Sequence, residues 1–269
     1  MPADLLATIE RYYDTVPRAS ARTEMLGPLT LFVATTGWPY YARPRLGHEG
    51  PVQAADVEAV RARQRELDVP EQLEWVAELT PTLEPACASA GLRVQRCPLL
   101  VLERLTATAP VDGVTVRLLQ PADPDLAQVR AAISVGFATT GTGRGAASTA
   151  ERDTAADRED AATARHYEQR MSAVQLRLAG AFTPAGAVGG GSHSPRGGVT
   201  EITGVGVLPA YRRRGIAAIV TSALARDARA LGVTSVFCSA DSDEVARVYE
   251  RVGFRRIGTA CIAEPPGGA

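Results

Sequence analysis

The sequence predicts a mixed α/β (α+β) fold, in which a mixed central sheet is flanked by helices and a second, smaller α/β domain accompanies it. Short apolar runs rich in β-branched residues alternate with segments of helical periodicity. A chain of 269 residues is long enough for two modest domains. Small, turn-prone residues at 106–113 separate two apolar runs. We therefore expect domains at residues 1–108 and 112–269.

Composition excludes several classes of protein. The formal net charge is −1 and there is no long basic tract, so nothing favours nucleic acid or an anionic membrane as a partner. No apolar run approaches the ~20 residues of a membrane span, and the N-terminus lacks a signal-peptide pattern. The four cysteines form no Cys-x-x-Cys pair, so we expect buried free thiols, no metal site and a cytoplasmic location.

The first half is expected to contain strands at residues 29–34 and 99–104 and helices at residues 52–67 and 70–79. One short segment, Cys87-Ala-Ser-Ala-Gly-Leu, has the spacing of Tyr249-Glu-Arg-Val-Gly-Phe in the second half. Both segments precede a predicted strand. The match predicts an internal repeat, with an unrelated α/β domain as the alternative.

The second half is expected to follow the order β-α-α-β-β-β-α-β-α-β. Strands are predicted at residues 114–119, 174–182, 187–192, 199–207, 235–239 and 255–263. Helices are predicted near residues 126–137, around 165–171, at 216–231 and in a short segment that ends at 254. Residues 138–164 are expected to form a mobile polar loop that leads into a helix, and the glycine-rich stretch 189–198 to form a hairpin turn.

The most informative segment is Gly204 to Ala217, where an apolar strand ends at Pro209 and three arginines precede a glycine that opens a helix. A helix N-terminus carries unpaired N–H groups and the positive end of the dipole, so it attracts anions. Gly215 lets a ligand approach the backbone closely. The pattern favours a pyrophosphate site; a solvated basic turn is the alternative.

The spacing Arg212-x-x-Gly215-x-Ala217 resembles the coenzyme A loop of the GNAT acyltransferase superfamily. The closing Tyr249-x-x-x-Gly253-Phe254 is similar to the family signature that places a tyrosine beside the coenzyme sulfur. Loop, helix, strand and tyrosine helix occur in family order over roughly sixty residues. The resemblance implies a GNAT fold for the second half and suggests that the first half is a degenerate copy, with Cys87 at the tyrosine position and no coenzyme loop.

The resemblance also implies the site residues. Acetyl-CoA would be held at its pantetheine arm by a bulged strand and at its pyrophosphate by the loop and helix start; the contacts are Val205, Gly206, Val207, Arg212, Arg213, Arg214, Gly215, Ile216 and Ala217. Tyr249 would act as general acid and Glu201, through water, as candidate base. His193 and His166 are further candidates for the base. Many relatives carry asparagine where this chain has Ser242, which leaves that coenzyme contact open.

The resemblance therefore implies transfer of an acetyl group from acetyl-CoA to the amine of a small molecule, without a metal. The polar loop at 138–164 and the interdomain cleft would select the acceptor. Two alternatives remain open at this point: a non-catalytic acyl-CoA-binding or partner-binding module, and transfer of a different acyl group. The acceptor itself is not identified, and a homodimer is open because pairing is common in the family.

Overall fold

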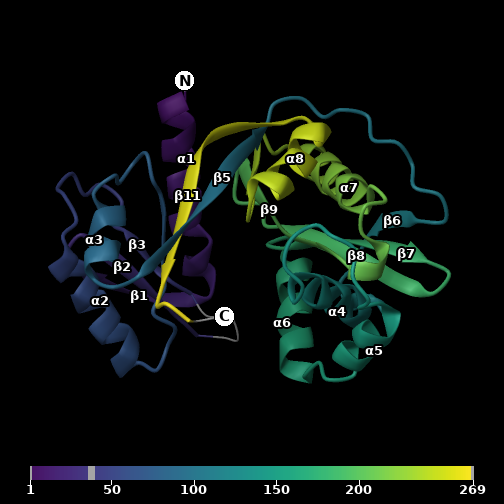
Figure 1. The fold of residues 1–269 in the computed structure, drawn as a ribbon, viewed down its shortest axis with the longest axis horizontal. Helices are drawn as coiled ribbons and strands as arrows, with labels where there is room; N and C mark the ends of the chain where they lie inside the picture. The colour runs from purple at the N-terminus through teal and green to yellow at the C-terminus, as the bar shows by residue number, and fades with distance from the viewer. Residues whose placement is uncertain (1, 36–39, 268–269) are drawn as a thin grey trace. The chain divides into compact units, whose positions relative to one another are not determined.

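The computed structural model describes residues 2–35 and 40–267, which form two compact units (Figure 1). One unit comprises Met1–Leu99 and Arg256–Ala269, and the other comprises Leu100–Arg255. Each unit combines a sheet of parallel and antiparallel strands with helices and has its own hydrophobic core. The predicted α/β class is confirmed.

In the first unit the strands lie in the order β1-β2-β3-β4-β11-β5, with β11 supplied by the C-terminus of the chain (Figure 1). Its core gathers fully buried side chains such as Leu31, Val57 and Trp75. The elements are α1 (Pro2–Thr15), η1 (Pro17–Ala19), β1 (Ala21–Leu26), β2 (Leu29–Ala34), β3 (Ala42–Pro44), α2 (Ala54–Glu66), β4 (Leu73–Val76), α3 (Leu83–Ser89), β5 (Arg93–Leu102) and β11 (Phe254–Glu264).

The helix expected at residues 70–79 is wrong, because this segment contains the strand β4. Leu73, Trp75 and Val76 are all buried, and β4 pairs with β3 on one edge and with β11 on the other. An interior strand is buried on both faces, so its apolar residues do not alternate with polar ones, and periodicity alone cannot separate it from a helix. The helix expected at 52–67 is confirmed as α2.

In the second unit the strands lie in the order β10-β9-β8-β7-β6. Strands β9 and β10 run parallel, and β6 to β9 form an antiparallel meander. The elements are β6 (Thr115–Leu118), α4 (Leu126–Phe137), α5 (Thr149–Ala156), α6 (Ala161–Ser172), β7 (Arg177–Thr183), β8 (Gly186–His193), β9 (Val199–Val207), η2 (Pro209–Tyr211), α7 (Ile216–Ala230), β10 (Ser235–Ser239) and α8 (Asp243–Val252).

Glycines Gly189 to Gly191 lie inside β8 and not in a hairpin turn, which corrects the expectation for residues 189–198. Their role is to admit helices on both faces of the sheet. A Cβ at Gly190 would lie 2.7 Å from Cγ1 of Val129 in α4, and a Cβ at Gly191 would lie 3.1 Å from Cδ1 of Leu224 in α7. Helix α4 therefore packs on one face and α7 on the other, as Figure 1 shows.

The segment expected to be a polar loop contains helix α5 and the start of α6. Ser148 and Glu151 form a capping box at the first helix, and the Asp160 carboxylate accepts from the N–H groups of Ala162 and Thr163 at the second. These are standard start signals, so the two helices could have been predicted from the residues themselves. The loop proper is shorter and spans residues 138–148, which we call the α4–α5 loop.

The compact units have other bounds than the domains 1–108 and 112–269, which stay a prediction: the second unit already begins at Leu100. Residues 256–269 belong to the first unit, because β11 pairs with β4 from Ala260 opposite Val76 to Ala263 opposite Leu73. Cys261 and Ala263 are buried in the core of that unit. Nothing in the local sequence of residues 254–264 indicates which sheet the strand completes.

Candidate functional site

The strands β9 and β10 separate after three residues. They are paired in parallel only at Val199 to Glu201, whereas the other edge of β9 stays paired with β8 as far as Val207. Among the described residues, the edge of β9 from residue 202 to residue 207 that faces β10 therefore has no strand partner. An unpaired strand edge can bind an extended ligand in the way that it would pair with an added strand, although the Val207 carbonyl already accepts from Arg212 Nε at 3.3 Å.

A β-bulge lies within this open edge. The pairing of β8 with β9 shifts between Gly190 opposite Gly206 and Ser192 opposite Thr203, so two residues of β9 stand opposite one residue of β8. Gly204 supplies the left-handed backbone that the bulge uses, with φ of 63°. The irregularity expected in Gly204–Gly206 is therefore present.

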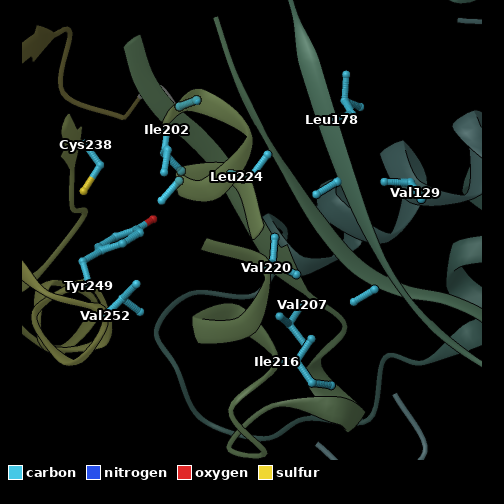
Figure 2. Close-up of a cluster of buried hydrophobic side chains, with 14 of the residues drawn as sticks. Val129, Leu178, Ile202, Val207, Ile216, Val220, Leu224, Cys238, Tyr249 and Val252 are labelled. Carbon is cyan, nitrogen blue, oxygen red and sulfur yellow. The ribbon is translucent and has the colours of Figure 1, made fainter. Parts of the chain in front are cut away.

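Helix α7 begins just beyond this strand and has an uncapped N-terminus. Gly215 is its N-cap, with φ of 89°, no side chain caps it, and its first turn holds no acidic residue. Ile216 and Val207 bury their side chains in the core, next to each other in Figure 2, so they can offer a ligand only backbone groups. Ala217 is half-buried and small. The predicted helix start and its positive dipole end are thus present.

The three arginines before Gly215 differ sharply in exposure. Arg213 and Arg214 are exposed; the Arg213 guanidinium lies 3.4 Å from the Glu244 carboxylate, and Arg214 donates to the Asp112 carbonyl at 3.2 Å. Arg212 is 8 % exposed, and its guanidinium donates to backbone carbonyls. The sequence predicts that all three arginines contact the coenzyme, but only the exposed Arg213 and Arg214 can reach a ligand in solvent.

Tyr249 projects from α8 into the core of the second unit. In Figure 2 its phenol points toward Ile202 of β9 and Leu224 of α7, and Cys238 of β10 lies near its ring. Burial is the main reason that the pKa of Tyr249 lies well above its usual range, and the charges of Cys238 and Glu201 add to the effect. The phenol is therefore neutral at physiological pH and carries a proton that it can donate.

Glu201 lies at the last paired position of β9, opposite Phe237, and Ser239 Oγ donates to its Oε1 at 3.4 Å. Because Glu201 raises the pKa of both Tyr249 and Cys238, its carboxylate is electrostatically coupled to both groups. The Glu201 carboxylate thus lies close enough to the Tyr249 phenol to raise its pKa, near the point where β9 and β10 part.

Two of the other candidate side chains, those of His193 and Ser242, have structural partners within the second unit. His193 is fully buried, with Nδ1 3.1 Å from Thr200 Oγ1 and Nε2 2.9 Å from Asp227 Oδ2, so both ring nitrogens are committed. Burial lowers the pKa of His166, which lies on α6. Ser242 caps α8 by accepting from the Val245 N–H at 3.4 Å.

Sequence reasoning missed two features of this region. Gly136 of α4 lies directly on β9, where a Cβ would come within 2.9 Å of Val207 N. Glu244, in the first turn of α8, accepts from Thr142 of the α4–α5 loop as well as from Arg213. An isolated glycine in a helical pattern is a weak signal of close backbone approach, and the Glu244 contacts have no local signal at all.

Comparison with known proteins agrees with this geometry. Residues 145–254 match the acetyltransferase (GNAT) family. The chain is similar in structure to a GCN5-related N-acetyltransferase from Kribbella flavida, with a TM-score of 0.72 and 22% identity over 98% of this chain and 96% of that one. A GCN5-related N-acetyltransferase from Sphaerobacter thermophilus has a TM-score of 0.53 and 18% identity, with 98% and 92% covered.

A tandem GNAT protein from the clavulanic acid biosynthesis pathway is also similar, with a TM-score of 0.52 and 17% identity over 90% of this chain and 79% of that one. These likenesses establish the GNAT fold across nearly the whole chain. No sequence match to a curated protein was found. Within residues 2–35 and 40–267, no helix has the length and apolar character needed to cross a membrane.

Proposed function

We propose, from the GNAT acetyltransferase domain at residues 145–254, that this chain moves an acetyl group from acetyl-CoA to the amine of a small molecule. The family match supports acyl transfer from an acyl-CoA in general. The observation that carries the finer proposal is the open edge of β9, which leads into an uncapped α7 N-terminus and is flanked by Tyr249 and Glu201.

The residues present fit coenzyme A. Its diphosphate requires hydrogen-bond donors and positive charge, which the first turn of α7 and the exposed Arg213 and Arg214 offer. Its pantetheine arm carries amides that can pair with an unpaired strand edge, and β9 offers such an edge from residue 202 to residue 207. We assign Val205, Gly206 and Val207 to that pairing, through their backbone groups.

When bound, the coenzyme supplies a thioester carbonyl that a neutral amine can attack. An alkylammonium has a pKa of ~10, so its deprotonation at pH 7 costs about 4 kcal/mol and needs an acceptor. Glu201, half-buried at the mouth of the β9–β10 separation, is our candidate to take that proton through water. Backbone N–H groups of the bulge are available to the carbonyl oxygen as negative charge develops on it.

Tyr249 is our candidate to give its phenolic proton to the departing sulfur. A free thiol has a pKa of ~8.5 and a free phenol ~10, so the transfer is uphill for the groups in water. Burial raises the pKa of Tyr249 further. It also raises the pKa of a thiol, so the transfer is less uphill to a sulfur that lies in the same apolar site than to a sulfur in water. The buried surroundings of Tyr249 provide such a site.

The described residues of the first unit lack the features on which the coenzyme site depends. Its helix α2, which follows β3 as α7 follows β9, begins with a capping box in which Asp56 accepts from the Gln53 N–H at 2.9 Å. An acidic residue in that turn opposes a second anion. The strand β3 ends in Pro44, which has no N–H, and the fully buried Cys87 stands where the motif has Tyr249. We therefore propose one coenzyme site per chain.

Calorimetric titration with acetyl-CoA tests this proposal, because it reports stoichiometry as well as affinity. We expect one site per chain at micromolar affinity. The double variant Arg213→Gln/Arg214→Gln should weaken binding by about tenfold or more. The double variant Arg158→Gln/Arg226→Gln removes the same charge from exposed positions of the second unit and should bind like wild type. Two sites would contradict the single-site assignment, and no binding would remove acetyl-CoA as donor.

A panel of small amines with detection of released coenzyme A then tests the reaction. Release that depends on one amine class supports acetyl transfer to that class. Stoichiometric binding with no release by any amine, peptide or hydroxyl acceptor would favour the non-catalytic acyl-CoA-binding module. Faster release of coenzyme A from a longer acyl-CoA than from acetyl-CoA would mean that the chain transfers a different acyl group. The assignment of the coenzyme site would not change.

A further inference from the structure

The side chain of Arg212 uses every hydrogen-bond donor that it has. A guanidinium carries five N–H groups in a planar fork. In this structure five backbone carbonyls accept from it: Val207 O from Nε at 3.3 Å, Gly141 O and Gly143 O from Nη1 at 2.8 and 3.2 Å, and Thr139 O at 2.9 Å and Gly136 O from Nη2. No N–H is left for a phosphate oxygen.

The charge of Arg212 is balanced by backbone dipoles. Burial lowers the pKa of its guanidinium, and no carboxylate in the described part of the chain forms an ion pair with it. One of its acceptors, the Gly136 carbonyl, belongs to the last turn of α4. The C-terminal carbonyls of a helix lack intrahelical partners and carry its negative dipole end, so a cation is stabilised there. Arg212, which follows β9 in the chain, thus caps the C-terminus of α4.

Four of the five carbonyl oxygens that accept from Arg212 belong to Gly136 and to residues of the α4–α5 loop, and the fifth belongs to Val207 at the end of β9. The same loop forms two backbone bonds with the turn that precedes α7: Gly145 N–H donates to Pro209 O at 3.2 Å, and Ala210 N–H donates to Ala147 O at 3.0 Å. The loop is therefore wrapped around the β9–α7 turn, with the Arg212 guanidinium at its centre.

We propose that Arg212 is a positioning residue, which holds the α4–α5 loop against the β9–α7 turn and contacts neither coenzyme nor acceptor. This inference rests on the proposed coenzyme site, since the turn that Arg212 supports presents the α7 N-terminus. The α4–α5 loop and the β9–α7 turn are then held together, and loss of the guanidinium loosens both. On this proposal, Arg212 of the sequence motif connects the α4–α5 loop to the β9–α7 turn, while Arg213 and Arg214 supply positive charge to the ligand.

Hydrogen exchange in the free protein tests this proposal without any ligand. In Arg212→Gln we expect the backbone amides of the α4–α5 loop, including that of Gly145, to exchange about tenfold faster or more than in wild type. The amide of Ala210 in the β9–α7 turn should exchange faster by a similar factor. Arg214→Gln is the matched control, because it removes a neighbouring exposed guanidinium with the same substitution; its loop exchange should equal that of wild type. Unchanged loop exchange in Arg212→Gln would overturn the proposal.

Calorimetry with acetyl-CoA at two salt concentrations separates a positioning role from a phosphate contact. Salt screens an exposed charge–phosphate contact, so Arg214→Gln should reduce the salt dependence of the dissociation constant. Arg212→Gln should weaken binding but keep the wild-type salt dependence. A reduced salt dependence together with unchanged loop exchange would make Arg212 the phosphate ligand that the sequence predicts, and the proposal would be wrong.

A conservative variant covers the case in which Arg212→Gln does not fold. Lysine has three N–H donors on one atom and cannot span five carbonyls, so Arg212→Lys should give loop exchange between wild type and Arg212→Gln. Wild-type exchange in Arg212→Lys would count against the fork geometry and thus against the proposal. Failure of wild type to bind acetyl-CoA would remove the proposed function, yet the exchange result would still decide the role of Arg212.

Discussion

The aromatic rings of Tyr249 and Phe254 pack edge to face, with centroids 5.8 Å apart and planes at 61°. Between them Gly253 ends α8 with φ of 107°, and a Cβ there would lie 1.9 Å from the Arg104 carbonyl oxygen. The Tyr-x-x-x-Gly-Phe motif therefore has a structural reason. Glycine allows the sharp turn and the close approach of residue 104, and phenylalanine then fixes the ring of the tyrosine.

We expect Tyr249→Phe to bind acetyl-CoA with wild-type affinity and to turn over roughly 10²-fold more slowly, because the ring contacts remain and only the acidic proton is lost. Calorimetry and the rate of coenzyme A release measure the two effects separately. Phe254→Leu is the matched control: it loosens the ring packing but keeps the phenol, so its turnover should fall less. Turnover of Tyr249→Phe equal to wild type would remove Tyr249 from the mechanism.

The backbone features of the site could be predicted from the sequence. The strand Ser235–Ser239, the start of α7 at Ile216 and the bulge at Gly204–Gly206 lie where the residues indicate. Each depends on local signals: β-branched runs, a glycine at a helix start, and glycines within a strand. Helix α1 (Pro2–Thr15) was not predicted.

The part that depends on tertiary contacts could not be predicted. Nothing near Arg212 indicates that its guanidinium turns inward to carbonyls of residues 136–143, whereas Arg213 and Arg214 stay in solvent. His193 is similar, since its partner Asp227 is 34 residues away. An isolated ionisable residue has the same sequence pattern whether it binds a ligand or a distant backbone segment.

Gly206→Ala tests the close approach of α4 to β9. The new Cβ would lie 2.9 Å from the Ile133 carbonyl oxygen and 3.0 Å from its Cα, and both are backbone atoms that cannot rotate away. We expect a loss of about 1–3 kcal/mol in the free energy of unfolding, measured by denaturant titration. Gly143→Ala is the control, because its Cβ would meet open space; its stability should stay within about 0.5 kcal/mol of wild type. Equal stability of the two variants would contradict the packing described.

The four cysteine thiols should be unreactive in the native protein. Cys87, Cys97, Cys238 and Cys261 are buried, and none of these four thiols forms a disulfide. Burial raises the pKa of Cys87 and of Cys261 to about 12, and that of Cys238 well above its usual range, so little of the reactive thiolate is present. A thiol-specific chromogenic reagent at pH 8 should label no thiol in minutes and all four in denaturant. Rapid labelling of one native thiol would contradict this.

We expect the Asp227 carboxylate to stabilise the second unit against unfolding most strongly above about pH 4. Burial on its own would raise the pKa of this carboxyl, but hydrogen bonds from His193 and Arg177, both at 2.9 Å, outweigh it and hold the pKa far below its usual range. A carboxyl whose pKa is lower in the folded than in the unfolded state adds stability above the unfolded pKa of ~3.9, and that stability is lost as the pH falls below it.

We therefore expect Asp227→Asn to lower the free energy of unfolding by about 3 kcal/mol at pH 7, because it leaves Arg177 and the buried His193 without their carboxylate. The difference in the free energy of unfolding between this variant and wild type should be smaller below about pH 4 than at pH 7, because Asp227 of the unfolded wild-type chain becomes protonated there. Denaturant titrations across this range measure it, with the exposed Asp157→Asn as control, whose stability should stay within about 0.5 kcal/mol of wild type. A gap that widens toward acid pH would mean that Asp227 is neutral in the folded protein, and the ion pair with Arg177 would then contribute nothing.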